Sequence, residues 1–276
     1  MGKGPGMFGD IGKRTKDLLT RDFTSDQKFT VTSSTSSGIT FTSFGNKKGE
    51  QFAGNVNTQF KTNNMTVNVK VDTESNIHGV ITADEIAKGA KTVFTFTIPD
   101  NKCGKIKFQY VHDLFGLATS IGLTSSPVAD LSAALGNDVV AVGGELSFDT
   151  ASGKLSRYSG GIGLTKPDYS AALITADKGD TLKASYCHTV NANTKTTVGA
   201  EVSHSISKKQ NTFTIGALYV LDPLTAVKAR LNNHGQVGAL LQHEWRPKST
   251  VTLCGEVDTK ALNSRPKIGL AVALKP

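Results

Sequence analysis

The side chains in this chain that could do chemistry are mainly isolated cations. One group lies near the N-terminus and consists of Lys13, Arg14, Lys16 and Arg21. A second group lies on strand-like segments, where each lysine shares a face with polar neighbours: Lys28, Lys61, Lys70, Lys91, Lys105 and Lys107. Positive charges spread in this way attract small anions. For Lys28 and Lys61 there is an alternative, that they sit at strand ends and anchor the chain at a membrane interface.

Motifs for catalysis or metal binding are missing from the sequence. There is no Gly-x-Ser-x-Gly, P-loop or dinucleotide motif. The six histidines show no i, i+4 pairing and no cysteine partner, so neither an enzyme nor a metal or cofactor site is expected. Cys103, Cys187 and Cys254 are far apart and odd in number, which favours free thiols.

The net charge of +8 is compatible with nucleic acid, an anionic membrane surface or small anions as partners. The basic residues are scattered, without a basic run or a recognition-helix pattern, so nucleic-acid recognition is not expected as the main role. An electropositive interior or a solvated surface explains them better.

These cations must be positioned by two kinds of element, of which the first is a helix. Apolar residues and one threonine recur at helical spacing between Met7 and Leu19, which predicts a short amphipathic helix and then a polar linker, together residues 1–25. Gly9 and Gly12 each weaken such a helix by roughly 1 kcal/mol relative to alanine. A basic amphipathic helix could lie on a membrane surface or inside a channel, and the periodicity does not choose between them.

The remaining residues, 26–276, alternate with period two and read as one domain. Between Met65 and Asp72, for example, methionine and valines face one way and polar residues the other, and Asn63-Asn64 before them predicts a hairpin turn. Counting such runs gives about 19 strands, each near the 9–11 residues that a tilted membrane strand needs. The fold class predicted is therefore all-β.

Several features favour a barrel in a membrane over a soluble sheet. The sequence has no run of about 18 apolar residues, so a transmembrane helix is not expected. No secretory signal is expected at the N-terminus. The sequence also has no repeated blade motif, so a propeller is not expected. The polar faces are rich in Thr, Ser, Asn and Gln, which suits a wet interior. In lipid a sheet must close on itself so that no backbone group is left unpaired. A closed barrel of about 16 or more strands encloses an aqueous channel. If the number of strands is odd, the first and last strands run in the same direction and must pair in parallel. A soluble β-rich domain remains the alternative.

One long motif gives the chain a family resemblance. It runs from Tyr219 through Asp222-Pro223 and Thr225 to Ala229-Arg230-Leu231-Asn232-Asn233 and is similar to the eukaryotic porin signature. Further matches are residues 10–17, 81–84 and 89–91. The chain resembles the voltage-dependent anion channels of the mitochondrial outer membrane, and most of all the plant members.

This resemblance implies a 19-stranded barrel with the N-terminal helix inside the pore. It implies a voltage-gated, weakly anion-selective channel through which ATP, ADP, phosphate and ions diffuse across the outer mitochondrial membrane. Membrane lipid and these metabolites are the implied partners, with homo-oligomers and docked kinases as further candidates. Two other functions stay open: a docking platform with secondary conductance, and the related protein-import pore, which prefers cationic presequences.

The sequence departs from the family pattern at two places. The nucleotide-associated Gly-Leu-Lys of the family is Gly89-Ala90-Lys91 here, so Gly89 and Lys91 are candidates for a weak nucleotide contact, while Gly89 can equally be a turn glycine. Val69 stands where animal members carry a membrane-facing acid, which puts regulation through that acid in doubt. Asp222-Pro223 is expected to form a hairpin turn.

Overall fold

A computed structural model describes residues 4–84, 86–99, 104–191, 195–261 and 266–275. Cys103, most of the predicted turn at 99–101, and the predicted strand starts at Thr194 and Arg265 lie outside these residues. Within the described part of the chain, no helix is long and apolar enough to cross a membrane.

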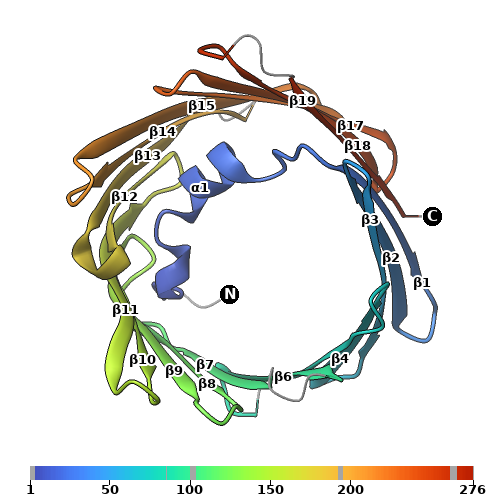
Figure 1. The fold of residues 1–276 in the computed structure, drawn as a ribbon, viewed down its shortest axis with the longest axis vertical. Coiled ribbons are helices and arrows are strands. Elements are labelled where there is room, and N and C mark those ends of the chain that lie inside the picture. Colours follow the sequence, from blue (N-terminus) through green and yellow to red (C-terminus); the bar gives the residue numbers. More distant parts are fainter. Residues whose placement is uncertain (1–3, 85, 100–103, 192–194, 262–265, 276) are drawn as a thin grey trace.

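Nineteen strands form a single sheet that closes on itself (Figure 1). The first ten are β1 Gln27–Ser34, β2 Ile39–Lys48, β3 Gln51–Lys61, β4 Met65–Asp72, β5 Ile77–Asp84, β6 Ala90–Ile98, β7 Lys105–Val111, β8 Phe115–Gly122, β9 Val128–Gly136 and β10 Val140–Asp149. The other nine are β11 Lys154–Thr165, β12 Tyr169–Ala176, β13 Thr181–Asn191, β14 Thr196–Ser205, β15 Gln210–Asp222, β16 Thr225–Asn232, β17 Gln236–Arg246, β18 Ser249–Asp258 and β19 Lys267–Leu274. The predicted strand count is confirmed, with boundaries that differ from the predicted ones by a few residues.

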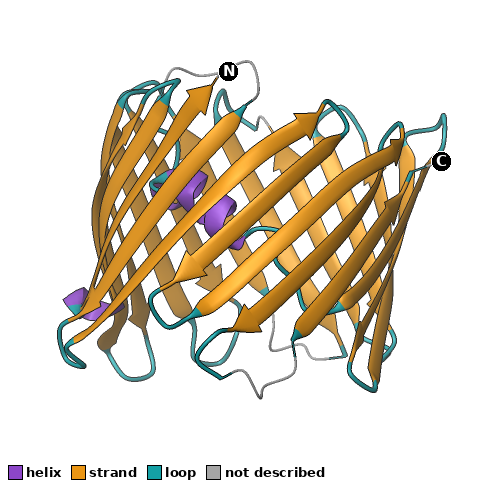
Figure 2. Ribbon diagram, turned by 90° about the horizontal axis from the view of Figure 1, so that it is seen from above, coloured by secondary structure: helices purple, strands orange, loops and turns teal. Residues whose placement is uncertain are grey.

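Neighbouring strands pair antiparallel all the way round, and the ring is closed by one parallel pair. There β1 runs beside β19, with Gln27 opposite Leu270 and Val31 opposite Leu274. An odd number of strands makes this pairing unavoidable, and it leaves the sheet without a free edge. The strands tilt around a wide interior, as the side view shows (Figure 2).

The N-terminal segment lies inside this ring and identifies its inner face (Figure 1). Leu18 and Leu19 contact the wall where Gly199 and Gly216 stand, so these glycines face the lumen. Residues paired across adjacent strands point to the same side of a sheet, so the register carries this assignment from strand to strand around the barrel. Phe29, Val56 and Val69 thereby fall on the outer face, where they are exposed.

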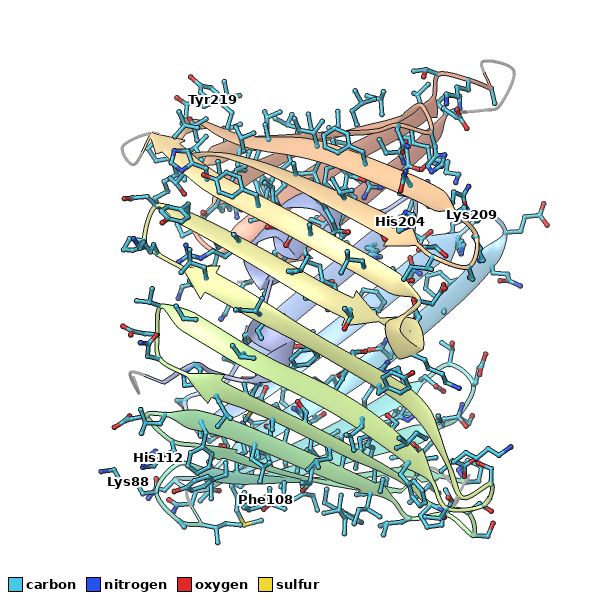
Figure 3. All side chains as sticks on the ribbon, turned by 90° about the vertical axis from the view of Figure 1, so that its left-hand side faces the viewer. Lys88, Phe108, His112, His204, Lys209 and Tyr219 are labelled. Carbon is cyan, nitrogen blue, oxygen red and sulfur yellow. The ribbon has the colours of Figure 1, made fainter. Side chains whose placement is uncertain are left out.

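The outer face carries the large apolar side chains, and aromatic residues lie near its rims. Figure 3 shows Tyr219 and His112 close to one rim and His204 close to the other. Lys166 and Arg246 lie over the rings of Tyr169 and Trp245, at 5.4 and 5.2 Å from the ring centroids. Amphipathic rings beside cations are typical of the level where lipid headgroups begin.

The predicted short N-terminal helix is present, but it is shorter than the stretch from Met7 to Leu19 that the helical spacing indicated. The segment forms a short 3₁₀ turn, η1 Phe8–Asp10, and a separate helix, α1 Lys13–Thr20. Between them Gly12 has a φ of 73°, in the left-handed region that glycine adopts without steric cost. The break turns the two pieces relative to each other, so that both can lay their apolar residues on the curved wall.

Two predicted turns are present where expected. Strand β3 ends at Lys61 and β4 begins at Met65, with Asn63-Asn64 between them, and Pro223-Leu224 separates β15 from β16. The turn residues therefore set the hairpin positions.

Candidate functional site

The most structured part of the lumen is the stretch of wall on which the N-terminal segment lies. Phe8 and Ile11 are buried against Ala134 and Ala172 of the wall. Thr15, Leu18 and Leu19 are buried to the same degree further along the segment. Each fully buried leucine or phenylalanine stabilises by about 1.5–3 kcal/mol, so this stripe holds the segment on the wall without help from the membrane.

The wall under the stripe is hollowed by glycines. A Cβ at Gly199 would lie 2.7 Å from Leu18 Cδ2, and one at Gly216 would lie 2.6 Å from Leu19 Cδ2. At Gly163 the nearest atom would be Ile11 Cγ2, at 3.0 Å. The glycines on the inner face therefore form a trough shaped for this segment, and larger residues would push it away.

Arg230 fastens the C-terminal end of α1. Its guanidinium donates to the carbonyl of Leu19 at 2.8 Å and to Glu256 at 2.7 Å, and it lies 4.3 Å from the ring centroid of Phe23. The last carbonyls of a helix have no partner within the helix, and a cation there also complements the helix dipole. Arg230 belongs to the long sequence motif, whose role in seating the segment the sequence did not reveal.

Two further cations tie the segment to the wall. Lys228, also in the motif, pairs with Asp22 at 3.1 Å. Arg14 donates to the carbonyls of Lys166 and Pro167, at 2.7 and 3.3 Å. The signal that could have found Lys228 and Arg230 is alternation, because both share a strand face with Asn232 and lie opposite apolar Val227 and Leu231.

The other basic residues of the segment are partly compensated. Lys13 pairs with Asp10 at 3.0 Å, and this hydrogen-bonded carboxylate raises the pKa of Lys13. Arg21 lies 3.8 Å from Asp17. For Lys16, which is exposed, no ion pair occurs within the described residues. The predicted cluster of positive charge is therefore present in the lumen, but it is weaker than the sequence suggests.

All six strand lysines of the prediction lie on the lumen face by register. Lys28 is opposite Asn46, Lys70 is opposite Asn57, and Lys107 is opposite Ser120. The same argument places Lys61, Lys91 and Lys105 inward. Lys28 and Lys61 stand at strand ends, so the alternative of interfacial anchors stays open for these two.

These six lysines differ in their partners. Lys91 pairs with Asp84 at 3.1 Å, and Lys105 pairs with Asp130 at 2.8 Å. Asp130 also accepts hydrogen bonds from Ser120 and Ser147. Among the described residues no carboxylate pairs with the remaining four lysines, which are Lys28, Lys61, Lys70 and Lys107.

Most of the six lysines lie away from the N-terminal segment. Lys105 and Lys107 are the exception, because they line one cavity together with Met7 and Gly9. The six lysines come from β1, β3, β4, β6 and β7. The segment contacts β9 and β10 through η1, and β13 to β15 through α1. Figure 1 shows α1 close to β13 and β14 and on the other side of the ring from β2 to β4. The segment thus lies on one part of the lumen wall, and Lys28, Lys61 and Lys70 stand on another.

Sequence reasoning missed charged residues on the lumen face, among them Arg157 and Lys183. Arg157 pairs with Glu145 at 2.8 Å, on adjacent strands β11 and β10. Lys183 pairs across to Ser203 and so faces inward. Both follow the period-two alternation that identified the other lysines.

Gly89 has a clear backbone role. Its φ is 82°, and an added Cβ would collide with the carbonyl of Val111, whose amide donates to the carbonyl of Gly89 at 2.9 Å. It immediately precedes β6, as a turn or strand-entry glycine would. Lys91, two residues later, faces the lumen, where its amine is engaged by Asp84.

Comparisons with known proteins agree with this architecture. The family model described as eukaryotic porin matches residues 4–269. The mitochondrial outer membrane protein porin of 36 kDa from Solanum tuberosum is 54% identical over the full length of both chains. An outer plastidial membrane protein porin from Pisum sativum is 46% identical, and the mitochondrial outer membrane protein porin 1 of Arabidopsis thaliana is 48% identical, again over both full lengths.

One solved structure is similar in fold alone. A triple mutant of the Rhodopseudomonas blastica porin matches with a TM-score of 0.51 and 11% identity, covering 80% of this chain and 89% of its own. At that identity the match says nothing of shared residues.

Proposed function

This chain belongs to the eukaryotic porin family, and we propose from that premise that its lumen is a voltage-gated, weakly anion-selective path for ATP, ADP and phosphate. The protein is a transmembrane β-barrel of the mitochondrial outer membrane, through which metabolites and ions diffuse. Anion preference, voltage gating and the choice of metabolites are the parts proposed here.

The observation that supports anion preference most directly is a set of lysines on the lumen face that have no carboxylate partner among the described residues. Lys70 and Lys107 lie inside the wall without a carboxylate partner among the described residues. Lys91 and Lys105 carry the same charge, but Asp84 and Asp130 offset it. Exposed charges in a wide pore are screened beyond about 8 Å at physiological salt, so the preference is modest.

Metabolite anions pass with weak contacts. Transport does not need an enclosed pocket of cationic side chains that binds the metabolite without its water. A site that bound the metabolite tightly would slow its release from the pore. In the candidate pair Gly89 and Lys91, the carbonyl of Gly89 accepts from the amide of Val111, and the Lys91 amine beside Asp84 supplies the positive charge for a weak nucleotide contact.

Voltage gating needs charges that move in the membrane field. One elementary charge crossing 100 mV changes the energy by about 2.3 kcal/mol, so displacement of a few charges is enough to shift open and closed populations. The candidate charges are those of the N-terminal segment, Lys13, Arg14, Lys16 and Arg21, together with the wall lysines.

Planar-bilayer recording in a potassium chloride gradient tests the proposal. The wild-type reversal potential should indicate anion preference, and Lys70→Gln with Lys107→Gln should shift it toward zero. The matched control removes one paired lysine together with its partner, as Lys91→Gln with Asp84→Asn, and should leave the reversal potential unchanged. A cation-preferring wild-type channel, or an equal shift in the control, would contradict the proposal.

A further inference from the structure

The outer wall beside the parallel seam contains a hollow. It has a volume of about 710 Å³ and lies over β19, β1, β2 and β3, with the end of β4 (Val71 and Asp72) and Thr73 of the next turn at its edge. Gly45 and Gly54 are directly paired and form the floor of the hollow. Because neither has a side chain, the backbone is bare at two adjacent positions of the lipid face. We define these residues and their rim as the seam hollow.

The rim of the seam hollow is apolar and strongly exposed. Phe29 is paired with Gly45 on one side and with Val272, across the parallel pair, on the other, so all of them point to the outer face. Phe52 is 68% exposed, Val56 51% and Phe29 50%, although all three are large apolar side chains. The hollow therefore has a backbone floor without side chains and is flanked by exposed aromatic side chains. A flexible hydrocarbon chain can pack into such a groove.

One end of the seam hollow is polar. Its lining there includes Lys47 and also Asp72, whose carboxylate accepts from the amides of Glu74 and Asn76. Lys47 lies opposite both Gln27 and Phe52, so its amine belongs to the outer face next to the β2–β3 turn. The pairing of β3 with β4 ends at Asn55, so the residues of β3 nearer this turn have no partner in β4. The amide of Gly54 donates a hydrogen bond to the hydroxyl of Thr73 instead. The apolar hollow therefore ends in a patch with an amine at the level where headgroups begin.

We propose that the seam hollow binds an anionic glycerophospholipid, with an acyl chain over Gly45 and Gly54 and the phosphate beside Lys47. The apolar face of a transmembrane barrel is covered by hydrocarbon, which makes a membrane lipid the available occupant. An amine beside an apolar slot complements a molecule that joins a phosphate to a hydrocarbon chain. The rigid, side-chain-studded wall of a second barrel cannot reach a floor made of backbone.

The hollow can be filled without disturbing the fold. A Cβ at Gly45 would lie 3.5 Å from the ring of Phe52, and one at Gly54 would lie 3.4 Å from Thr73 Cγ2, both ordinary van der Waals distances. Neither glycine has a positive φ. Gly45→Leu with Gly54→Leu is therefore the filling variant. Gly160→Leu is its matched control, because Gly160 faces lipid on the far side of the barrel with nothing closer than 3.7 Å.

Photo-crosslinking tests the proposal. The full chain is reconstituted in phosphatidylcholine vesicles with a small fraction of phosphatidylglycerol carrying a diazirine on its acyl chain, and labelled peptides are mapped by mass spectrometry. Labelling should concentrate on β1 to β3, be lost in the filling variant and persist in Gly160→Leu. Lys47→Gln should abolish a preference of about fivefold over a diazirine phosphatidylcholine, whereas Lys209→Gln at the same rim should not.

Three outcomes would overturn it: labelling spread evenly around the barrel, labelling that Gly45→Leu with Gly54→Leu leaves intact, or labelling displaced by crosslinks between two barrels at β1 to β3. Single-channel conductance of every variant shows that the barrel is formed. Loss of lipid labelling with normal conductance is therefore the expected result for the filling variant.

Discussion

Arg230 joins three parts of the molecule that are far apart in sequence. Its guanidinium contacts the carbonyl of Leu19, the carboxylate of Glu256 and the ring of Phe23. Its side chain is 25% exposed, so these contacts are only partly screened. Hydrogen bonds to charged groups contribute about 1.5–3 kcal/mol each. Arg230 is therefore expected to be the strongest polar attachment of the N-terminal segment.

Replacing Arg230 with methionine should release the C-terminal end of α1. A loss of about 2 kcal/mol would raise the population of the detached segment roughly 30-fold, since each 1.4 kcal/mol is a factor of ten. Trypsin cleavage after Lys16 and Arg21 in vesicles measures this population. Arg157→Met is the control, because Arg157 also pairs with a glutamate on the lumen wall, at 2.8 Å, but makes no hydrogen bond to the C-terminal end of α1 among the described residues. Equal cleavage of both variants would show that Arg230 is not a specific attachment.

At the scale of elements, the N-terminal segment fits its trough because large apolar side chains of the segment face glycines of the wall. The segment supplies leucines, and the wall supplies glycines at the facing positions. The left-handed Gly12 lets the chain change direction between η1 and α1. The position of the segment thus depends on the wall glycines as much as on its own sequence.

Gly199→Leu should displace α1. The first added carbon would lie 2.7 Å from the end of Leu18, and a larger side chain cannot be accommodated while the helix stays in place. A spin label on Lys16→Cys should report greater mobility in this variant. Gly255→Leu is the matched control, because Gly255 faces outward and has no atom within 4 Å of an added Cβ. Unchanged mobility in Gly199→Leu would mean that the helix is not held by the trough.

The sequence predicted the strands better than it predicted the N-terminal segment. Strict alternation, as in Met65 to Asp72, is a local property, so the strand count and the inward faces of Lys70 and Lys107 could be obtained from it. The break at Gly12 could not, because it depends on the curvature of a wall assembled from β9 to β15. The attachment by Lys228 and Arg230 was missed for the same reason, since their partners lie more than 200 residues away.

At the scale of the whole molecule, the channel is a wide ring with its charges distributed unevenly. The segment lies against β9, β10 and β13 to β15, whereas Lys28, Lys61 and Lys70 come from β1, β3 and β4, away from α1 (Figure 1). The parallel pair of β1 and β19 closes the ring next to these lysine-bearing strands and also borders the seam hollow. The lysines proposed to favour anions and the proposed lipid site thus both belong to β1 to β7 and the adjoining β19.

If selectivity arises from the summed field of these lysines, it should depend strongly on salt. The Debye length falls from about 30 Å at 0.01 M to about 3 Å at 1 M, so distant lysines act together at low salt and hardly at all at high salt. The anion-to-cation permeability ratio of the wild type, measured in bilayers with a fixed concentration ratio, should fall toward one as the mean salt rises. The Lys70→Gln, Lys107→Gln variant should differ from the wild type most at low salt. A ratio that stays constant over this range would point instead to a close-range binding site, because ions in direct contact with an amine are little affected by screening.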